Sequence, residues 1–183
     1  MTDRRNQEFL DCLEPLYERA YTFAAHLTGS AADAEDLLQE ALLQALRKFD
    51  TLREREKFKS WFYRILHNTW LEQGRRQKRR PSTPVAPEGL LHVADSASGP
   101  AERYSEIEYL LQHVNPVQRE TLLLFEVEGF SLKEIADLHG VGVATVKSRL
   151  FQAKDKIRRG LHGVRPAVMT AEPAAEGVRH VVY

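Results

Sequence analysis

The sequence lacks most features of a secreted or membrane protein. It contains a single cysteine, Cys12, in 183 residues, which excludes a disulfide framework within one chain and suits a reducing cytosol. No apolar run approaches the roughly 20 residues that span a bilayer, and the N-terminus lacks the pattern of a signal peptide. We therefore expect a cytoplasmic protein with no membrane insertion.

Motifs for cofactor or covalent chemistry are also missing. The chain has no glycine-rich phosphate loop, no nucleophile–base arrangement and no His/Cys spacing typical of a metal site. Its 7 histidines are scattered, and we expect each to be an ordinary surface or packing residue. The sequence thus predicts no catalytic residue, no cofactor and no metal ligand, which argues against an enzyme.

Net charge is absent as well, because 26 Lys and Arg balance 26 Asp and Glu. The balance hides a separation of charge along the chain. Residues 61–80 hold 6 basic and 1 acidic side chains, and residues 131–160 hold 7 and 3. Residues 81–130 between them hold 2 basic and 8 acidic side chains. Two positive segments separated by a negative one favour two separate contacts with a polyanion.

The stretch "SLKEIADLHGVGVATVKSRL" has the pattern of two helices joined by a glycine turn. Ser131 and Glu134 have the spacing of a capping box, and Gly140 can adopt positive φ and end the first helix. Thr145 is then expected to be the N-cap of the second helix. That helix would bury one stripe: Val146, Leu150, Ala153 and Ile157. This is the layout of a helix-turn-helix, whose second helix enters the major groove by its N-terminal end.

The exposed face of the second helix is basic and polar. Its candidate DNA-binding residues are Ala144, Thr145, Lys147, Ser148, Arg149, Gln152 and Lys154. We expect the cationic groups to contact phosphates and the hydroxyl and amide groups to lie near base edges. The alternative is an αα-hairpin packed inside another helical protein, which the basic free face disfavours.

Helical periodicity divides the chain into two parts. Residues 8–80 and 101–162 each have the pattern of a small helical domain, while residues 81–100 are rich in Pro, Ser, Gly and Ala, as linkers are. Residues 163–183 form a tail without a clear helical pattern, which we expect to be flexible. The sequence therefore predicts an all-α fold with two domains joined by a linker.

Local signals place several helix boundaries. Ser30 with Asp33 can cap a helix that follows Gly29, and Asn115-Pro116 can form the N-cap and first position of a later helix. Gly74 would cost about 1 kcal/mol relative to alanine. We expect it to kink or end its helix before the arginines that follow.

The other basic segment lies on and after a helix with four aromatic side chains. Polar and basic groups recur on one side of this helix, and the candidate DNA-binding residues are Arg64, Asn68, Arg75, Arg76, Lys78 and Arg79. Basic groups that follow phosphates beside pocketed bases are typical of single-stranded nucleic acid binding. We expect most of the aromatics, Trp61, Phe62, Tyr63 and Trp70, to be core residues instead.

Three stretches in order, "DAEDLLQEALLQALRKFD", "FKSWFYRILHNTWLEQGRRQKRR" and "EGFSLKEIADLHGVGVATVKSRLFQA", resemble the extracytoplasmic-function (ECF, group 4) sigma factors of bacterial RNA polymerase. The resemblance covers about residues 10–160. It implies two helical domains of the sigma-70 family, region 2 in residues 8–80 and region 4 in residues 101–162. Ala144 departs from the family's usual glycine, and Glu72 from its usual aspartate.

The resemblance also implies partners. Region 2 would dock on the β′ clamp coiled coil of RNA polymerase core through Asp36, Gln39, Glu40, Leu43 and Arg47. It would melt the minus-10 element and hold it single-stranded beside Asn68. Region 4 would read the double-stranded minus-35 element and contact the β flap. An anti-sigma factor is a further expected partner.

Two other classes of function stay open at this point. One is a one-component helix-turn-helix repressor or activator that works without polymerase core. The other is an adaptor whose basic segments bind RNA or acidic proteins with steep salt dependence.

Overall fold

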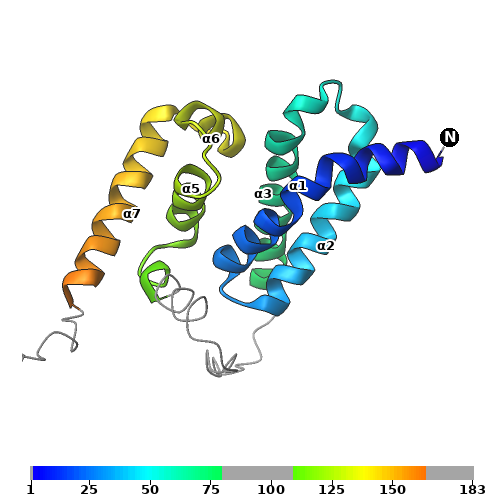
Figure 1. Cartoon of the computed structure of the whole chain (residues 1–183). Coiled ribbons are helices and arrows are strands. Elements are labelled where there is room, and N and C mark those ends of the chain that lie inside the picture. The colour runs from blue at the N-terminus through cyan, green and yellow to red at the C-terminus, as the bar shows by residue number, and fades with distance from the viewer. Residues whose placement is uncertain (1, 80–108, 164–183) are drawn as a thin grey trace, which may run out of the picture.

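The computed structural model of the chain describes residues 2–79 and 109–163 (Figure 1). Every regular element in these two ranges is helical, which confirms the predicted all-α fold for the residues described. The helices are α1 (Thr2–Thr28), α2 (Ala31–Lys48), α3 (Phe58–Arg79), α5 (Pro116–Glu126), α6 (Leu132–His139) and α7 (Val143–Gly163), with the 3-10 turns η1 (Phe49–Thr51) and η2 (Arg55–Lys57) between α2 and α3. The predicted linker and residues 164–183 of the tail lie outside the described residues. None of the described helices is both long and apolar enough to cross a membrane.

The predicted caps of α2 and α5 are confirmed. The Ser30 side chain accepts a hydrogen bond from the backbone N–H of Asp33, and Gly29 before it has φ 72°. The Asn115 side chain accepts one from the N–H of Gln118, and Pro116 occupies the first turn. Each cap satisfies a backbone donor that has no partner inside its helix.

Two predicted boundaries are wrong. Thr145 is not the N-cap of α7, because the carbonyl of Gly142 already accepts hydrogen bonds from the N–H groups of Thr145 and Val146 at 2.9 and 3.3 Å. The helix therefore begins three residues earlier than predicted, at Val143. Gly74 does not end α3, which continues to Arg79. Bonds from α3 to the Glu40 carboxylate of α2, formed on both sides of the glycine, hold it in the helix.

The helices α1 to α3 form the N-terminal bundle, whose core is aromatic. Phe49 is fully buried, and its ring packs edge-on against Phe9 and Phe58 at centroid distances of 5.3 and 6.0 Å. Phe62 and Tyr63 are buried, while Trp61 and Trp70 are partly buried against the core. The prediction that most of these aromatics are core residues is confirmed.

The helices α5 to α7 form the C-terminal bundle, which packs against the N-terminal bundle. Figure 1 shows α5 between α7 and the N-terminal helices, and α1 contacts α5 while α3 contacts α6. The Phe130 ring lies 5.3 Å from the Tyr63 ring, and the Lys59 ammonium lies 4.9 Å from the Phe130 centroid. We call this packing the closed arrangement. The sequence predicted two domains joined by a linker and did not predict that the two bundles pack together.

Candidate nucleic-acid interface

The turn between α6 and α7 has the geometry of a helix-turn-helix. The Ser131 hydroxyl accepts a hydrogen bond from the Glu134 N–H, and the Glu134 carboxylate accepts one from the Ser131 N–H at 2.8 Å, which completes the capping box. The Ser131 hydroxyl also donates a hydrogen bond to the Glu134 carboxylate at 2.6 Å. This bond, followed by the one from the Ser131 N–H, lowers the pKa of the Glu134 carboxyl. Gly140 has φ 65° and ends α6, and the N–H of Val141 donates to the Ala136 carbonyl. The predicted unit is therefore confirmed in its turn and its first cap.

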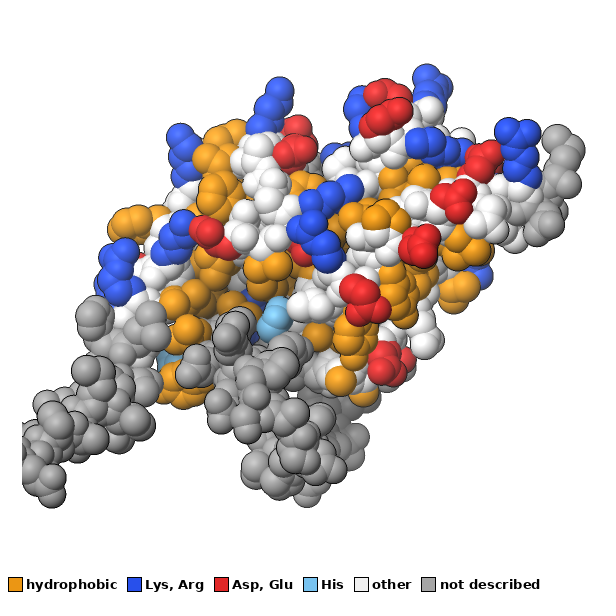
Figure 2. All heavy atoms as spheres, in the orientation of Figure 1, with side chains coloured by type: hydrophobic (Ala, Val, Ile, Leu, Met, Phe, Trp, Pro, Cys, Tyr) orange, Lys and Arg blue, Asp and Glu red, His pale blue; other side chains and the backbone are white. Residues whose placement is uncertain are grey.

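The start of α7 presents polar side chains to solvent. Val146, Leu150 and Ala153 are buried and Ile157 is partly buried, which is the predicted stripe. Ala144, Thr145, Lys147 and Ser148 are exposed on the opposite side. Figure 2 shows Lys and Arg side chains spaced along the edge of the molecule that α7 forms. A helix N-terminus with hydroxyl and cationic side chains suits phosphates and base edges.

The other three predicted residues of α7 are held by contacts within the chain. The Arg149 guanidinium lies 3.3 Å from Nδ1 of His139, so that this half-buried residue bonds to α6. The Lys154 ammonium pairs with the Glu126 carboxylate at 2.6 Å. The amides of Gln152 and Gln118 bond at 2.5 Å. Contact with DNA through these three side chains requires an exchange of partners.

The predicted region 2 residues surround a hollow on α3. Arg64 and Asn68 are exposed, and a hollow of about 370 Å³ is lined by Asn68, Glu72, Arg75, Arg76 and Arg79. Lys78 lies in α3, but its side chain is outside the described residues. The structure thus brings the asparagine and three of the predicted basic residues to one concave, mainly cationic surface.

Arg76 differs from its neighbours because its guanidinium is engaged by carboxylates. It pairs with Glu72 at 2.7 Å and with Glu40 at 3.1 Å, and the bond to Glu72, followed by the charges of both carboxylates, raises the pKa of Arg76. Arg76 therefore connects the hollow to α2.

The five predicted polymerase contacts lie on α2. Asp36, Gln39, Leu43 and Arg47 are exposed and Glu40 is half-buried. The Leu43 side chain is 56% exposed, although it is large and apolar. Asp36 and Glu40 also line a cleft of about 850 Å³, whose other lining residues include Pro116 and Lys156 of the C-terminal bundle. In the closed arrangement, the C-terminal bundle thus forms the opposite wall of this surface.

Sequence reasoning missed a buried acidic contact between the bundles. Glu128, just after α5, is 2% exposed, and its carboxylate lies 3.1 Å from the Arg19 guanidinium and 3.8 Å from the Lys59 ammonium. Lys59 also donates a hydrogen bond to the Glu128 carbonyl. Burial lowers the pKa of Lys59, and the Glu128 charge opposes this shift. Two basic residues of the N-terminal bundle thus neutralise one carboxylate of the C-terminal bundle.

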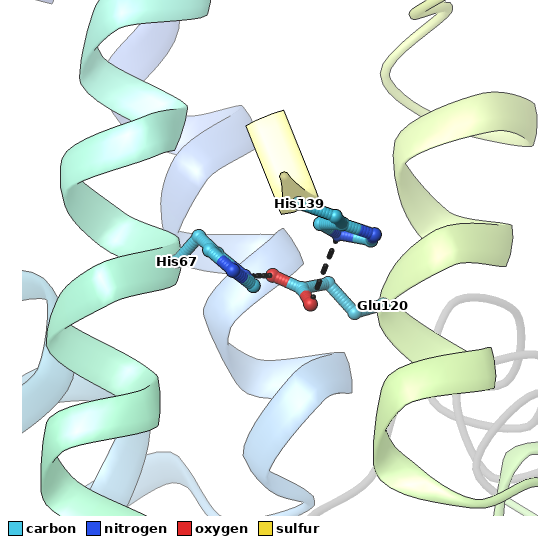
Figure 3. Close-up of side chains that lie close together, drawn as sticks. All are labelled: His67, Glu120 and His139. Carbon is cyan, nitrogen blue, oxygen red and sulfur yellow. Dashed lines mark hydrogen bonds and ion pairs between the residues drawn. The ribbon is translucent and has the colours of Figure 1, made fainter. Parts of the chain in front are cut away.

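A second missed cluster joins His67, Glu120 and His139 (Figure 3). Nδ1 of His67 lies 2.7 Å from Oε1 of Glu120, and Nε2 of His139 lies 3.2 Å from Oε2. Burial alone would raise the pKa of Glu120, but the contacts with His139 and His67 outweigh it and the pKa is lowered. Both histidines are packing residues, as expected, but the sequence did not predict that they share one buried carboxylate. No local pattern could show it, since 53 residues separate His67 from Glu120.

Two protein-family profiles match the chain, one over each bundle. The profile "Sigma-70 region 2" matches residues 12–80, and the profile "Sigma-70, region 4" matches residues 104–157. Over 191 residues the chain is 29% identical to the ECF RNA polymerase sigma factor SigG of Mycobacterium tuberculosis; the match covers 90% of this chain and 50% of SigG. The chain therefore spans half the length of that relative.

Other relatives match over most of their own length. The ECF RNA polymerase sigma factor EcfG of Rhodopseudomonas palustris is 33% identical over 137 residues, which cover 74% of this chain and 75% of EcfG. Among solved structures, the sigma factor RpoE of Bartonella quintana, in complex with the anti-sigma factor NepR, superposes with a TM-score of 0.70 at 28% identity, covering 90% of this chain and all of RpoE. Two sigma-70 regions in order, together with this identity to EcfG, show that the chain belongs to the ECF sigma factors of the sigma-70 family.

Proposed function

We propose that the chain directs promoter-specific transcription initiation by bacterial RNA polymerase core in the cytoplasm. The C-terminal bundle recognises a double-stranded minus-35 element, and the N-terminal bundle holds a single-stranded minus-10 element. The observation that carries the proposal is the exposed, polar and cationic start of α7 in the same chain as the cationic hollow beside Asn68. In this role the chain supplies specificity and makes no covalent change itself.

The contact with duplex DNA begins at the N-terminus of α7. Lys147 contacts a phosphate, and the hydroxyls of Thr145 and Ser148 lie at base edges. Ala144 keeps the helix start narrow enough to approach the groove. Arg149, Gln152 and Lys154 join when DNA replaces their partners in the protein. The free chain binds DNA weakly, because these exchanges cost affinity and each bundle by itself offers few contacts.

The contact with single-stranded DNA centres on Asn68. A flipped, unpaired base enters the hollow beside its amide, while Arg75 and Arg79 on the lining and Arg64 one turn earlier face the phosphates. Since the base is available only in melted DNA, this binding energy favours the open over the closed duplex. Arg76 contributes to the cationic surface from its position between two carboxylates.

The polymerase contact lies on α2. Asp36, Gln39, Glu40 and Arg47 surround the exposed Leu43, and an apolar side chain within a polar rim is typical of protein interfaces. This surface docks on the β′ clamp coiled coil, and the C-terminal bundle contacts the β flap. Because Asp36 and Glu40 form one wall of the cleft between the bundles, the C-terminal bundle restricts access to this end of the surface in the closed arrangement.

An anti-sigma factor is a further proposed partner. The Bartonella quintana RpoE structure is a complex with the anti-sigma factor NepR. Such a partner would stabilise a form in which the polymerase surface is covered. Capture of the chain from cells should bring down a small protein in addition to polymerase subunits; recovery of polymerase subunits alone contradicts this part of the proposal.

The direct test adds the purified chain to bacterial core RNA polymerase and maps transcript starts on a fragmented genomic library. We expect discrete starts that share two spaced upstream elements and that disappear without the chain. The proposal is overturned if no such starts occur and the chain alone footprints an operator as a dimer. Sequence-indifferent binding with steep salt dependence would instead identify an adaptor.

The duplex contact is tested by Lys147→Ala. Loss of one phosphate contact should weaken promoter binding about uniformly across sequences and lower the slope of log K against log salt by about 1. The matched control is Arg158→Ala, an exposed cation at the other end of α7, which should change neither quantity. An unchanged salt slope for Lys147→Ala removes this residue from the interface.

The single-strand contact is tested by Asn68→Ala on two templates. We expect slow open-complex formation on a fully paired promoter, because the flipped base loses its amide partner. A heteroduplex promoter with an unpaired minus-10 element should largely restore the rate of initiation, since melting is already complete. Equal impairment on both templates would show that Asn68 acts elsewhere.

A further inference from the structure

The His67–Glu120–His139 cluster joins three helices across the contact between the bundles. His67 lies on α3 of the N-terminal bundle, Glu120 on α5, and His139 is the last residue of α6. Figure 3 shows both imidazoles pointing at the carboxylate between them. The side chains of His67, Glu120 and His139 are 10%, 1% and 2% exposed. Two nitrogen ligands and one carboxylate therefore meet in a dry site that exists only when the bundles are in contact.

The polar atoms of this cluster have one another as partners. Oε2 of Glu120 and Nε2 of His139 lie 3.2 Å apart as a buried pair that does not meet hydrogen-bond geometry. A cation bound in place of the ring proton would contact both atoms, and their separation is close to that of two ligands on one metal ion.

The donor set selects the class of cation. Imidazole nitrogen with carboxylate oxygen suits Zn²⁺ and neighbouring transition metals, whereas Mg²⁺ and Ca²⁺ prefer oxygen ligands alone. The three donor atoms all lie within 4.8 Å of one another, and tetrahedral ligands around Zn²⁺ lie about 3.3 Å apart. With Glu120 bidentate, the two oxygens and two ring nitrogens supply four donors. Small side-chain rotations bring them to bonding distance.

We propose that His67, Glu120 and His139 bind one divalent transition-metal ion, zinc by preference, and that this ion locks the two bundles in the closed arrangement. A single ion bound by both bundles adds its binding energy to their contact. The polymerase surface at Asp36 and Glu40 then stays opposite the C-terminal bundle. This last consequence, a metal-dependent restraint on polymerase binding, rests on the proposed function.

Arg149 competes with a metal ion for His139, because each needs a different tautomer of this imidazole. Because a guanidinium only donates hydrogen bonds, its contact with Nδ1 of His139 requires the ring proton to lie on Nε2. A metal ion at Nε2 moves this proton to Nδ1, where it can no longer accept from Arg149, and the Arg149 side chain is displaced. Removal of this cation in Arg149→Ala should therefore raise the metal affinity severalfold.

The first experiment titrates the full chain, without a histidine tag and stripped by chelator, with Co²⁺ as a spectroscopic probe. We expect visible d–d bands that saturate at one ion per chain and that Zn²⁺ abolishes by competition. His67→Asn and Glu120→Gln should each lower the Co²⁺ affinity by at least about 100-fold. Loss of a residue that only supports a metal ligand can already cost about 100-fold, and these two residues are themselves ligands. The matched control, His113→Asn, changes an exposed histidine of the C-terminal bundle and should bind as the unmodified chain does.

Circular dichroism separates loss of the site from loss of the fold. His67→Asn changes only the N-terminal bundle, and Arg149→Ala removes no ligand, so the opposite effects of these two variants cannot both come from misfolding. The site is refuted if the unmodified chain shows no saturable Co²⁺ bands, or if His67→Asn and Glu120→Gln bind Co²⁺ as tightly as the unmodified chain.

The second experiment measures the distance between the bundles. Spin labels at Glu35→Cys and Arg158→Cys, both exposed positions, are placed in a Cys12→Ala background. If zinc binds only the closed arrangement, the ratio of closed to open chains rises about 100-fold at a zinc concentration 100 times the dissociation constant. The same zinc addition should leave the distance distribution of His67→Asn unchanged. Zinc binding without any change in the distribution overturns the locking role.

Transcription separates this inference from the proposed function. Zinc should lower initiation by the unmodified chain and spare His67→Asn, with core polymerase and zinc held constant. A chain that binds zinc and closes, but never directs transcription, refutes the proposed function and leaves the metal site standing. A chain that directs transcription but shows no saturable Co²⁺ bands refutes the metal site and leaves the proposed function standing.

Discussion

The two bundles differ in what they bury. The N-terminal bundle has an aromatic interior, and none of its described residues is a buried carboxylate. The C-terminal bundle has two carboxylates, Glu120 and Glu128, that are 1% and 2% exposed. Both face partners in the N-terminal bundle: His67 for the first, Arg19 and Lys59 for the second. The N-terminal interior is thus mainly apolar, whereas the C-terminal bundle depends on residues of its neighbour to bury both of its carboxylates.

This difference makes the contact between the bundles reversible. When the bundles separate, the two carboxylates and their basic partners return to water, which offsets the loss of their mutual attraction. The aromatic core of the N-terminal bundle has no such compensation and stays closed. A ligand that prefers one arrangement can therefore shift the equilibrium by its difference in affinity. The three proposed ligands, polymerase, an anti-sigma factor and a metal ion, would each act in this way.

The largest expected effect comes from the aromatic core. Phe49→Ala should destabilise the N-terminal bundle by about 4 kcal/mol, because it leaves a cavity among Phe9 and Phe58. The 2 tryptophans of the chain, Trp61 and Trp70, both lie on α3, so urea unfolding followed by fluorescence reports this bundle. The control Leu43→Ala changes an exposed residue and should stay within about 0.5 kcal/mol. A similar midpoint for both variants would contradict a self-sufficient aromatic core.

The next effect breaks the contact between the bundles. Glu128→Lys places a cation against Arg19 and Lys59 and should shift the equilibrium toward open chains by about 3 kcal/mol. The distance distribution between spin labels on the two bundles measures it. The control Glu126→Lys reverses an exposed charge two residues away, whose partner Lys154 belongs to the same bundle. If the Glu126 and Glu128 variants open equally, the buried pairs do not hold the bundles together.

The sequence could predict the features that depend on residues close together in the chain. Caps at Ser30, Asn115 and Ser131, and the buried stripe of α7, depend on residues three or four positions apart, so periodicity reveals them. The exposed start of α7 was predictable for the same reason. The predicted N-cap at Thr145 was wrong because the backbone carbonyl of Gly142 accepts the first hydrogen bonds of α7. Gly142 has no side chain that could indicate a cap in the sequence.

The contacts that close the molecule were not predictable in this way. The bond between Lys59 and Glu128 spans 69 residues, and the bond between Arg19 and Val127 spans 108. No period relates such positions, because periodicity connects only residues a few positions apart in the sequence. Arg149 and Lys154 look like free cations for the same reason: their partners come from other helices.

A smaller effect is expected at the turn of the helix-turn-helix. Gly140 has φ 65°, so Gly140→Ala forces a side chain into the left-handed region at a cost of about 1–2 kcal/mol, although nothing lies within 4 Å of the new Cβ. Gly142 has the same open space without a positive φ, and Gly142→Ala should cost only the N-cap preference of glycine over alanine, which acts on α7 and not on α6. Hydrogen exchange of the α6 amides measures both. Equal protection in the two variants would show that backbone strain at Gly140 is unimportant.

The smallest effect concerns the capping box and its dependence on pH. Bonds from Ser131 hold the pKa of Glu134 below its ordinary value of 4.5. Because the folded-state pKa is the lower one, ionised Glu134 stabilises the C-terminal bundle above pH 4.5, and this contribution disappears as the pH falls through the folded-state pKa. NMR titration should find the Glu134 pKa restored toward 4.5 in Ser131→Ala, which should also cost about 1 kcal/mol at neutral pH. An unmoved Glu134 pKa would mean that the Ser131 hydroxyl caps the backbone of α6 without stabilising the charge of the Glu134 carboxylate.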